Sequence, residues 1–205
     1  SKIALEIIYD RYGLSEYYPL FDEYYRVYSE KNTELWSLYH HNRISKETLI
    51  VERFRYPLQR VGAYNDKLVL QLNADYLSVL SEQGELVPQA RELLDYLKSR
   101  SYRLHIISNG FKEVQFKKMK SAGIENYFEK IILSDEVGVN KPHPDIFRYA
   151  LNKTGSSKNT SLMIGDNYDA DILGAMRSGL DQVYFNPLQK QIPDKFPTYE
   201  VTGII

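Results

Sequence analysis

The spacing of apolar residues along the chain changes near residue 84. Before that point apolar side chains recur every three or four positions, which is the period of an amphipathic helix. After it, short apolar runs alternate with helical patterns, which predicts βα units and a parallel sheet. The sequence therefore predicts a helical part over residues 1–82 and an α/β part over residues 83–205.

Four helices are predicted in the first part, over residues 3–12, 17–39, 46–59 and 66–81. Ser45 and Asn65 stand directly before the last two, where a side-chain oxygen caps the free N–H groups of a helix start. Pro57 lacks an N–H group and obstructs helical hydrogen bonding, so we expect the third helix to kink or end near Tyr56.

Strands and helices alternate in the second part. The strands are predicted over residues 103–108, 130–134, 161–164 and 182–185. The helices are predicted over residues 88–98, 111–122, 144–152 and 169–178. Because α/β proteins place their chemistry at the C-terminal ends of parallel strands, polar residues at these ends are the candidate site residues.

Eleven of the 18 tyrosines fall within the first 80 residues. Aromatic residues at helical spacing most often form a core. The alternative is that tyrosine hydroxyls, together with Trp36, His40 and His41, line a pocket that stacks a planar group. His40 and His41 are adjacent and point to different helix faces, so we do not expect them to bind one metal ion.

The charges of the chain almost cancel, with 26 Lys and Arg against 27 Asp and Glu and a net charge of −1. This balance gives no general attraction to a nucleic acid polymer or to an anionic membrane. There is no cysteine, so disulfides and thiol chemistry are excluded. No apolar run approaches the ~18 residues that span a bilayer. We expect a soluble, cytoplasmic protein, and the sequence leaves its oligomeric state open.

An acidic turn follows the predicted strand over residues 161–164. Gly165 and Asp166 end the apolar run, and Asp169 and Asp171 follow closely. Three carboxylates with no basic residue among them repel one another unless a cation lies between them. Hard oxygen ligands favour Mg²⁺ over zinc. The alternative is that these acids cap the next helix, where the macrodipole favours negative charge.

Two other strand ends carry groups that suit an anion. A Ser-Asn-Gly turn at residues 108–110 offers a hydroxyl and backbone N–H groups. Lys141 lies in a loop stiffened by Pro142 and Pro144, so its flexible side chain extends from a stiff stretch of backbone. Taken singly, these features also fit an ordinary turn and a solvated loop lysine. His143 is expected to be only the residue before a helix.

Together these three segments resemble the second, third and fourth motifs of the haloacid dehalogenase (HAD) superfamily of hydrolases. The matching segments are Ser108-Asn109-Gly110, Lys141-Pro142 and Gly165-Asp166 to Asp171-Ile172. Their order and their places at strand ends match as well, over residues 84–185. The resemblance implies an α/β fold, a Rossmann-like three-layer core with a parallel sheet, and the helical first part resembles the α-helical cap of such hydrolases. Within it, Leu35-Trp36 resembles the matching segment in the branch of phosphatases that act on pyrimidine 5′-monophosphates.

The resemblance implies a phosphomonoesterase in which an aspartate attacks phosphorus and forms a phospho-aspartyl intermediate. It further implies that Ser108 binds phosphate through its hydroxyl, helped by the N–H groups of Asn109 and Gly110. Lys141 would neutralise the nucleophile and one phosphate oxygen. These roles make Ser108 and Lys141 the catalytic candidates among the 205 residues.

The same resemblance implies a Mg²⁺ cofactor held by Asp166. Asp171 would support the metal-bound waters or Lys141 from the second shell, and Asp169 is expected at the surface of the helix start. A dianionic phosphate, a nucleophilic carboxylate and Asp166 bring about four negative charges together, of which Mg²⁺ and Lys141 cancel about three.

The first motif of the superfamily, Asp-x-Asp-x-Thr or Ser, does not occur in the 205 residues. Asp10 lies within a predicted helix and has the wrong context. In this superfamily the strand that carries the motif lies between the strands ending at Ser108 and Gly165, and without it both lose a ladder partner. We therefore expect a further N-terminal segment of about 10 to 20 residues upstream of Ser1 that carries the nucleophile.

Two alternative functions stay open beside the phosphatase. A 2-haloacid dehalogenase also uses an aspartate nucleophile, but it needs no metal and leaves Gly165-Asp166 unexplained. A non-catalytic HAD-like protein that binds a phosphate ligand would lack the nucleophile altogether. We favour a phosphatase whose substrate is a small phosphorylated metabolite or nucleotide. The resemblance of the cap points to a nucleoside 5′-monophosphate, and the sequence does not fix which one.

Overall fold

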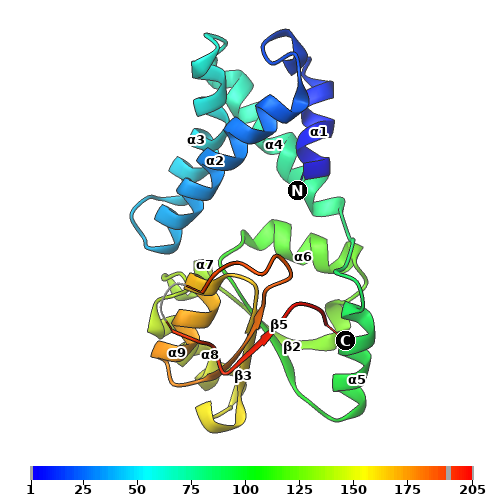
Figure 1. Cartoon of the computed structure of the whole chain (residues 1–205), viewed down its shortest axis with the longest axis vertical. Helices are drawn as coiled ribbons and strands as arrows, with labels where there is room; N and C mark the ends of the chain where they lie inside the picture. Colours follow the sequence, from blue (N-terminus) through cyan, green and yellow to red (C-terminus); the bar gives the residue numbers. More distant parts are fainter. Residues whose placement is uncertain (1, 193–194, 205) are drawn as a thin grey trace. The chain divides into compact units, whose positions relative to one another are not determined.

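A computed structural model of the chain describes residues 2–192 and 195–204. The chain forms two compact units (Figure 1). One comprises Ser1–Gly84 with Glu113–Ser121, and the other comprises Glu85–Lys112 with Ala122–Ile205. Within the described ranges, no helix is both long and apolar enough to cross a membrane.

The first unit consists of helices. They are α1 (Lys2–Arg11), the short 3₁₀ turn η1 (Leu14–Glu16), α2 (Phe21–His40), α3 (Lys46–Arg60), α4 (Asp66–Glu82) and most of α6 (Lys112–Ser121). Of these, α1 to α4 lie where the apolar spacing predicts helices, whereas the sequence predicts α6 as a helix of the second part. Both predicted caps are confirmed. The Ser45 side chain accepts a hydrogen bond from the N–H of Thr48 at 3.2 Å, and Asn65 does the same for Leu68 at 3.1 Å.

The sequence predicts that the third helix kinks or ends near Tyr56. It does not end there, because α3 continues through Pro57 to Arg60, and the kink stays a prediction. The side chains on either side of the proline explain this result. Phe54 and Leu58 are buried in the core, and the Tyr18 hydroxyl donates to the carbonyl of Pro57 at 2.7 Å. Packing of this kind outweighs the one helical hydrogen bond that proline removes.

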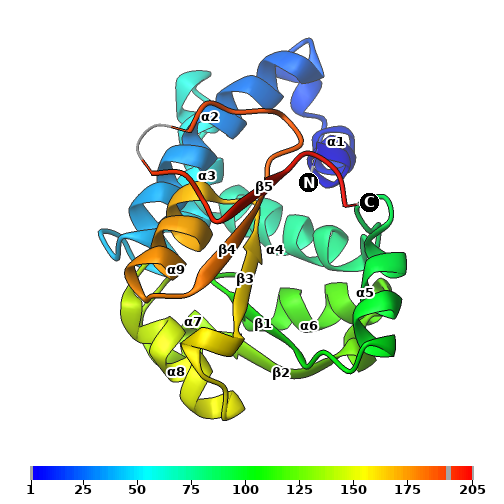
Figure 2. The same cartoon turned by 60° about the horizontal axis from the view of Figure 1, so that its bottom comes forward.

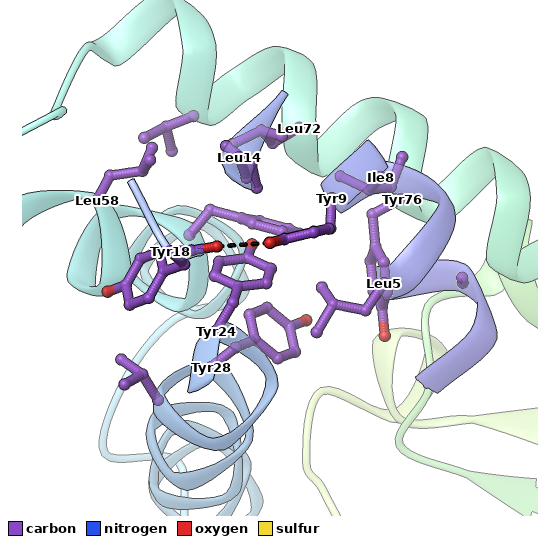
Figure 3. Packing of buried hydrophobic residues seen from close by; sticks show 14 residues of the cluster. Leu5, Ile8, Tyr9, Leu14, Tyr18, Tyr24, Tyr28, Leu58, Leu72 and Tyr76 are labelled. Atoms are coloured by element: carbon purple, nitrogen blue, oxygen red, sulfur yellow. Dashed lines mark hydrogen bonds between the residues drawn. The ribbon is translucent and has the colours of Figure 1, made fainter. Parts of the chain in front are cut away.

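The helical unit has an aromatic core (Figure 3). The Tyr24 and Tyr28 rings are buried with Leu5 and Ile8, and the Tyr9 hydroxyl donates to the carbonyl of Tyr18. Neighbouring rings meet in tilted or edge contacts with centroids 5.2–6.2 Å apart, a range in which aromatic pairs add stabilisation beyond the area that they bury. Several of the clustered tyrosines are therefore core residues.

A cation is buried among these rings. The Arg53 side chain is only 2% exposed, and its guanidinium carbon lies 4.9 Å from the centre of the Tyr76 ring and 5.4 Å from that of Phe54. It donates one hydrogen bond, to the side-chain oxygen of Asn73. Within residues 2–192 and 195–204 no carboxylate forms an ion pair with it, so Asn73 and the rings are its compensation for lost hydration.

Replacing Asn73 by leucine is expected to destabilise the protein by about 2–4 kcal/mol, because a buried guanidinium would lose its oxygen acceptor. Urea unfolding followed by circular dichroism measures the change. The double variant Arg53→Met with Asn73→Leu removes the buried charge as well, so it should recover most of the lost stability. A single variant as stable as the wild type would contradict this account of Arg53.

The second unit is an α/β structure with parallel strands, and the predicted fold class is confirmed. Its strands are β1 (Leu104–Ser108), β2 (Phe128–Leu133), β3 (Leu162–Gly165), β4 (Asp181–Phe185) and β5 (Tyr199–Val201). Its helices are α5 (Ala90–Ser99), α7 (Ser134–Val137), α8 (Pro144–Thr154) and α9 (Gly174–Arg177), with the 3₁₀ turns η2 (Glu125–Tyr127) and η3 (Lys158–Thr160). Ile132, Ile146, Phe147 and Ala175 are central members of its core, in which α8 packs against β1 and α9 against β4.

The described strands form two separate sheets. One has the order β1-β2 and the other has the order β3-β4-β5, with every pair parallel (Figure 2). Leu162 and Ile164 on β3 are each 48% exposed, which is unusual for a parallel sheet, because its strands are normally covered on both faces. Among the strands that the structure describes, β1 pairs with β2 alone and β3 with β4 alone, so each keeps one open edge.

Candidate functional site

The predicted site lysine, Lys141, lies at the C-terminal ends of two strands. Its ammonium donates to the carbonyl of Ile107 near the end of β1 and to a carboxylate oxygen of Asp171, both at 2.6 Å. Lys141 and Asp171 are 8% and 5% exposed, so this is a buried ion pair with short, charge-assisted hydrogen bonds. The structure thus brings together two residues that are 30 positions apart in the sequence.

Asp171 is held from a second side by the turn that carries it. Its other carboxylate oxygen accepts a hydrogen bond from the N–H of Asn167 at 3.0 Å, while the Asn167 side chain accepts one from the N–H of Ala170 at 2.9 Å. The segment Tyr168–Leu173 is a π-helical turn, η4, that leads into α9, whereas the sequence predicts one regular helix over residues 169–178. Such wide turns recur at functional sites because they redirect a side chain.

Gly165 makes room for the Asp171 carboxylate. A Cβ atom added at Gly165 would lie 2.3 Å from an Asp171 carboxylate oxygen and 2.5 Å from its Cβ and Cγ. The absence of a side chain at residue 165 therefore allows Asp171 to lie against the end of β3, within reach of Lys141.

The predicted Ser-Asn-Gly turn follows β1 directly. The N–H of Gly110 donates to the hydroxyl oxygen of Ser108 at 3.0 Å, so this N–H is used within the turn. The Asn109 side chain is buried and bonds both main-chain groups of Lys141, each at 2.8 Å. The three predicted residues of the turn therefore lie beside Lys141, and Asn109 contacts it through its side chain.

Asp166 is exposed at the C-terminal end of β3, and Asp169 is half-buried one turn further on. In the part of the chain that the structure describes, no three His, Cys, Asp or Glu side chains lie together as a metal site. Asp166 presents an exposed carboxylate at this strand end, whereas both carboxylate oxygens of Asp171 accept hydrogen bonds. One carboxylate suits Mg²⁺, which keeps several waters and is often shared with a substrate phosphate.

His143, His41 and Tyr184 contact groups other than Lys141 and Asp171. His143 precedes α8, and its ring nitrogen accepts from the N–H of Asp145 at 3.2 Å, as expected for a residue before a helix. The His41 ring bonds the carbonyl of Ser37 at 2.8 Å at the end of α2. Burial raises the pKa of Tyr184, and the carboxylates of Glu200 and Asp166 raise it further.

Most of the chain matches a known protein family. Residues 41–185 match the family described as haloacid dehalogenase-like hydrolase. The chain belongs to this family. The match contains all three segments at the strand ends, and it extends into the helical unit.

Several relatives of this hydrolase have known names. It is 30% identical to the pyrimidine 5′-nucleotidase YjjG of Escherichia coli over 184 residues, which are 89% of this chain and 80% of YjjG. It is 32% identical to the pyrimidine 5′-nucleotidase PynA of Streptococcus pneumoniae over 181 residues, covering 87% and 75% of the two chains. The crystal structure of the HAD-hydrolase YfnB of Bacillus subtilis, bound to magnesium, superposes with a TM-score of 0.89 at 28% identity, covering 98% of this chain and 86% of YfnB.

Three parts of this hydrolase's site were not foreseen in the sequence. The carbonyl of Ile107 is a main-chain acceptor, and no sequence signal marks it. The Asn109 amide pairs with a residue 32 positions away, which depends on the tertiary fold. Asn167 could have been identified, because an asparagine before a helix start is a common cap.

Proposed function

We propose that this haloacid dehalogenase-like hydrolase is a Mg²⁺-dependent phosphomonoesterase that acts through a phospho-aspartyl intermediate. Its substrate class would be small phosphate esters, with pyrimidine nucleoside 5′-monophosphates first among them. The observation that carries the proposal is Lys141, a buried ammonium fixed at the ends of two parallel strands beside the Ser108 turn. The names of YjjG and PynA support the substrate class, and the magnesium in YfnB supports the metal.

The Lys141 ammonium has the donors that phosphate binding needs. An ammonium carries three N–H groups, and in the described part of the chain two of them are bonded, to Ile107 and Asp171. One N–H is left for a phosphate oxygen. The buried carboxylate of Asp171 orients the ammonium through its hydrogen bond, while the hydroxyl of Ser108 would donate to a second phosphate oxygen.

The nucleophile of this proposal lies on one further parallel strand between β1 and β3. The Lys141 ammonium donates to Ile107 on β1 and to Asp171, which follows β3. Among the described strands, β1 and β3 are not paired with each other, and each has an open edge. A strand that paired with both open edges would join the two sheets. An aspartate at its C-terminal end would then lie beside the Lys141 ammonium.

The chemistry would follow from these positions. The aspartate oxygen attacks phosphorus and the bond from phosphorus to the ester oxygen breaks, and the leaving oxygen takes a proton from solvent water to depart as the alcohol. Water then attacks the phospho-aspartyl group, releasing phosphate and restoring the carboxylate. Lys141 would balance charge in both steps, and Asp166 would hold Mg²⁺, which supplies further positive charge at the phosphate when bound. In this proposal residues 1–82 are the helical cap and residues 83–205 the catalytic core.

The test uses the full-length protein and a panel of phosphate monoesters that includes pyrimidine and purine nucleoside 5′-monophosphates and sugar phosphates. Phosphate release is measured with Mg²⁺ and with excess EDTA. We expect release that depends on Mg²⁺ and is fastest with a pyrimidine nucleotide. No release from any ester in the presence of Mg²⁺ would overturn the proposal and favour a protein that only binds phosphate ligands.

Replacing Asp166 by asparagine is expected to raise the Mg²⁺ concentration needed for half-maximal activity by about 10- to 100-fold, because the amide keeps the shape but loses the charge of the ligand. The measurement is phosphate release at increasing Mg²⁺ concentration. Asp169→Asn is the matched control, three positions along the same turn, and should leave the Mg²⁺ requirement unchanged. Equal effects of the two substitutions would show that Asp166 is not the ligand.

A further inference from the structure

We infer that Asn109 is a positioning residue. Its side-chain amide holds the backbone of Lys141, so that the Lys141 ammonium stays between Ile107 and Asp171. This inference rests on the proposed function for its catalytic meaning. It gives Asn109 a role for its side chain, beyond any contact of its backbone N–H with phosphate.

The geometry is that of a peptide pair. The Asn109 amide nitrogen donates to the carbonyl of Lys141 at 2.8 Å, and the N–H of Lys141 donates to the Asn109 amide oxygen at 2.8 Å. Two antiparallel hydrogen bonds to one residue fix both its position and its rotation, as they do in a strand ladder. Both groups are buried, so water does not compete for them.

The loop around Lys141 has no helix or strand of its own, and one turn hydrogen bond spans it, from the N–H of His143 to the carbonyl of Asn140 at 2.8 Å. Residues 138–143 lie in neither a helix nor a strand, and Pro142 has no N–H group to donate. Within the described residues, Asn109 is the partner of both main-chain groups of Lys141. Without the amide, the flexible lysine side chain would be fixed only at its far end, by Ile107 and Asp171.

The same contact links the two phosphate-binding segments. Asn109 lies in the turn with Ser108 and Gly110, next to the hydroxyl that would meet phosphate. A shift of this turn therefore moves the Lys141 backbone with it. The link thus keeps the Ser108 hydroxyl and the Lys141 ammonium at a fixed separation. This matters because a displacement of about 1 Å can lower a rate about 100-fold.

The first test observes Lys141 without using activity. In the full-length protein labelled with ¹⁵N-lysine, the ammonium signal that disappears in Lys141→Met belongs to Lys141. We expect Asn109→Ala to shift or broaden that signal while the circular dichroism spectrum stays native. If Asn109→Ala does not fold, Asn109→Asp is used, because it keeps the acceptor for the Lys141 N–H and loses the donor to the carbonyl. An unchanged signal in the folded variant would overturn the inference, whether or not the protein is a phosphatase.

The second test separates positioning from direct phosphate binding. Asn109→Ala is expected to lower kcat by about 10- to 100-fold with a much smaller change in KM, while Asn152→Ala, at an exposed asparagine of α8, changes neither. In the Lys141→Met background, Asn109→Ala should cause little further loss, because its effect acts through Lys141. Losses that multiply in the double variant would show an independent role and overturn the inference.

Discussion

Lys141→Met is expected to lower phosphate release by the full-length enzyme about 100- to 1,000-fold, because the variant loses the fixed ammonium that donates a hydrogen bond to the phosphate. The methionine keeps the length of the side chain and removes its charge. The measurement is kcat with the best substrate of the ester panel at saturating Mg²⁺. A variant that retains wild-type kcat would rule out a catalytic role for this lysine.

The same substitution is expected to cost about 3–5 kcal/mol of stability, because it leaves the Asp171 carboxylate buried without its cation. Lys153→Met is the matched control. Lys153 also pairs with a carboxylate, that of Glu136, but both side chains are more than a third exposed, so its loss should cost far less stability. Urea unfolding of both variants tests the difference, and equal losses would contradict the buried-pair account.

Gly165→Ala is the second substitution with a large expected effect. Its methyl group would lie 2.3 Å from the Asp171 carboxylate oxygen, so Asp171 must move and its hydrogen bonds to Lys141 and Asn167 must lengthen or break. We expect a loss of about 1–3 kcal/mol in stability from the overpacking and a loss of about 100-fold in kcat from the displaced lysine. Thermal unfolding and phosphate release measure the two effects.

Gly155→Ala separates the two effects of Gly165→Ala. Gly155 ends α8 with a positive φ of 62°, and a Cβ there would meet nothing within 4 Å. Its replacement should therefore cost about 1 kcal/mol through backbone strain and leave kcat unchanged. A Gly165→Ala variant with normal kcat would show that the Asp171 position tolerates displacement.

The sequence predicts the features that depend on neighbouring residues. Ser45 and Asn65 cap helices whose first N–H groups are two or three positions away, so no tertiary information is needed to identify them. The strand ends at Ser108 and Gly165 follow from short apolar runs that stop at polar turns. These local signals also place the candidate site residues at the correct ends of their strands.

Other features depend on contacts between distant segments, and the sequence does not show them. The continuation of α3 through Pro57 depends on burial of Phe54 and on a hydroxyl from Tyr18, 39 residues away. The π-helical turn at Tyr168–Leu173 forms where Asp171 meets a lysine from another loop. In each case a tertiary contact outweighs the intrinsic preference of the local sequence.

The open edges of β1 and β3 have a consequence for handling the protein. Unpaired edges present rows of N–H and C=O groups that can pair with strands of other molecules, and the exposed Leu162 and Ile164 on β3 add apolar surface there. Any preparation in which both edges stay open is expected to self-associate as its concentration rises. A strand that paired with both edges, as proposed for the nucleophile, would also cover these backbone groups and lower the tendency to self-associate.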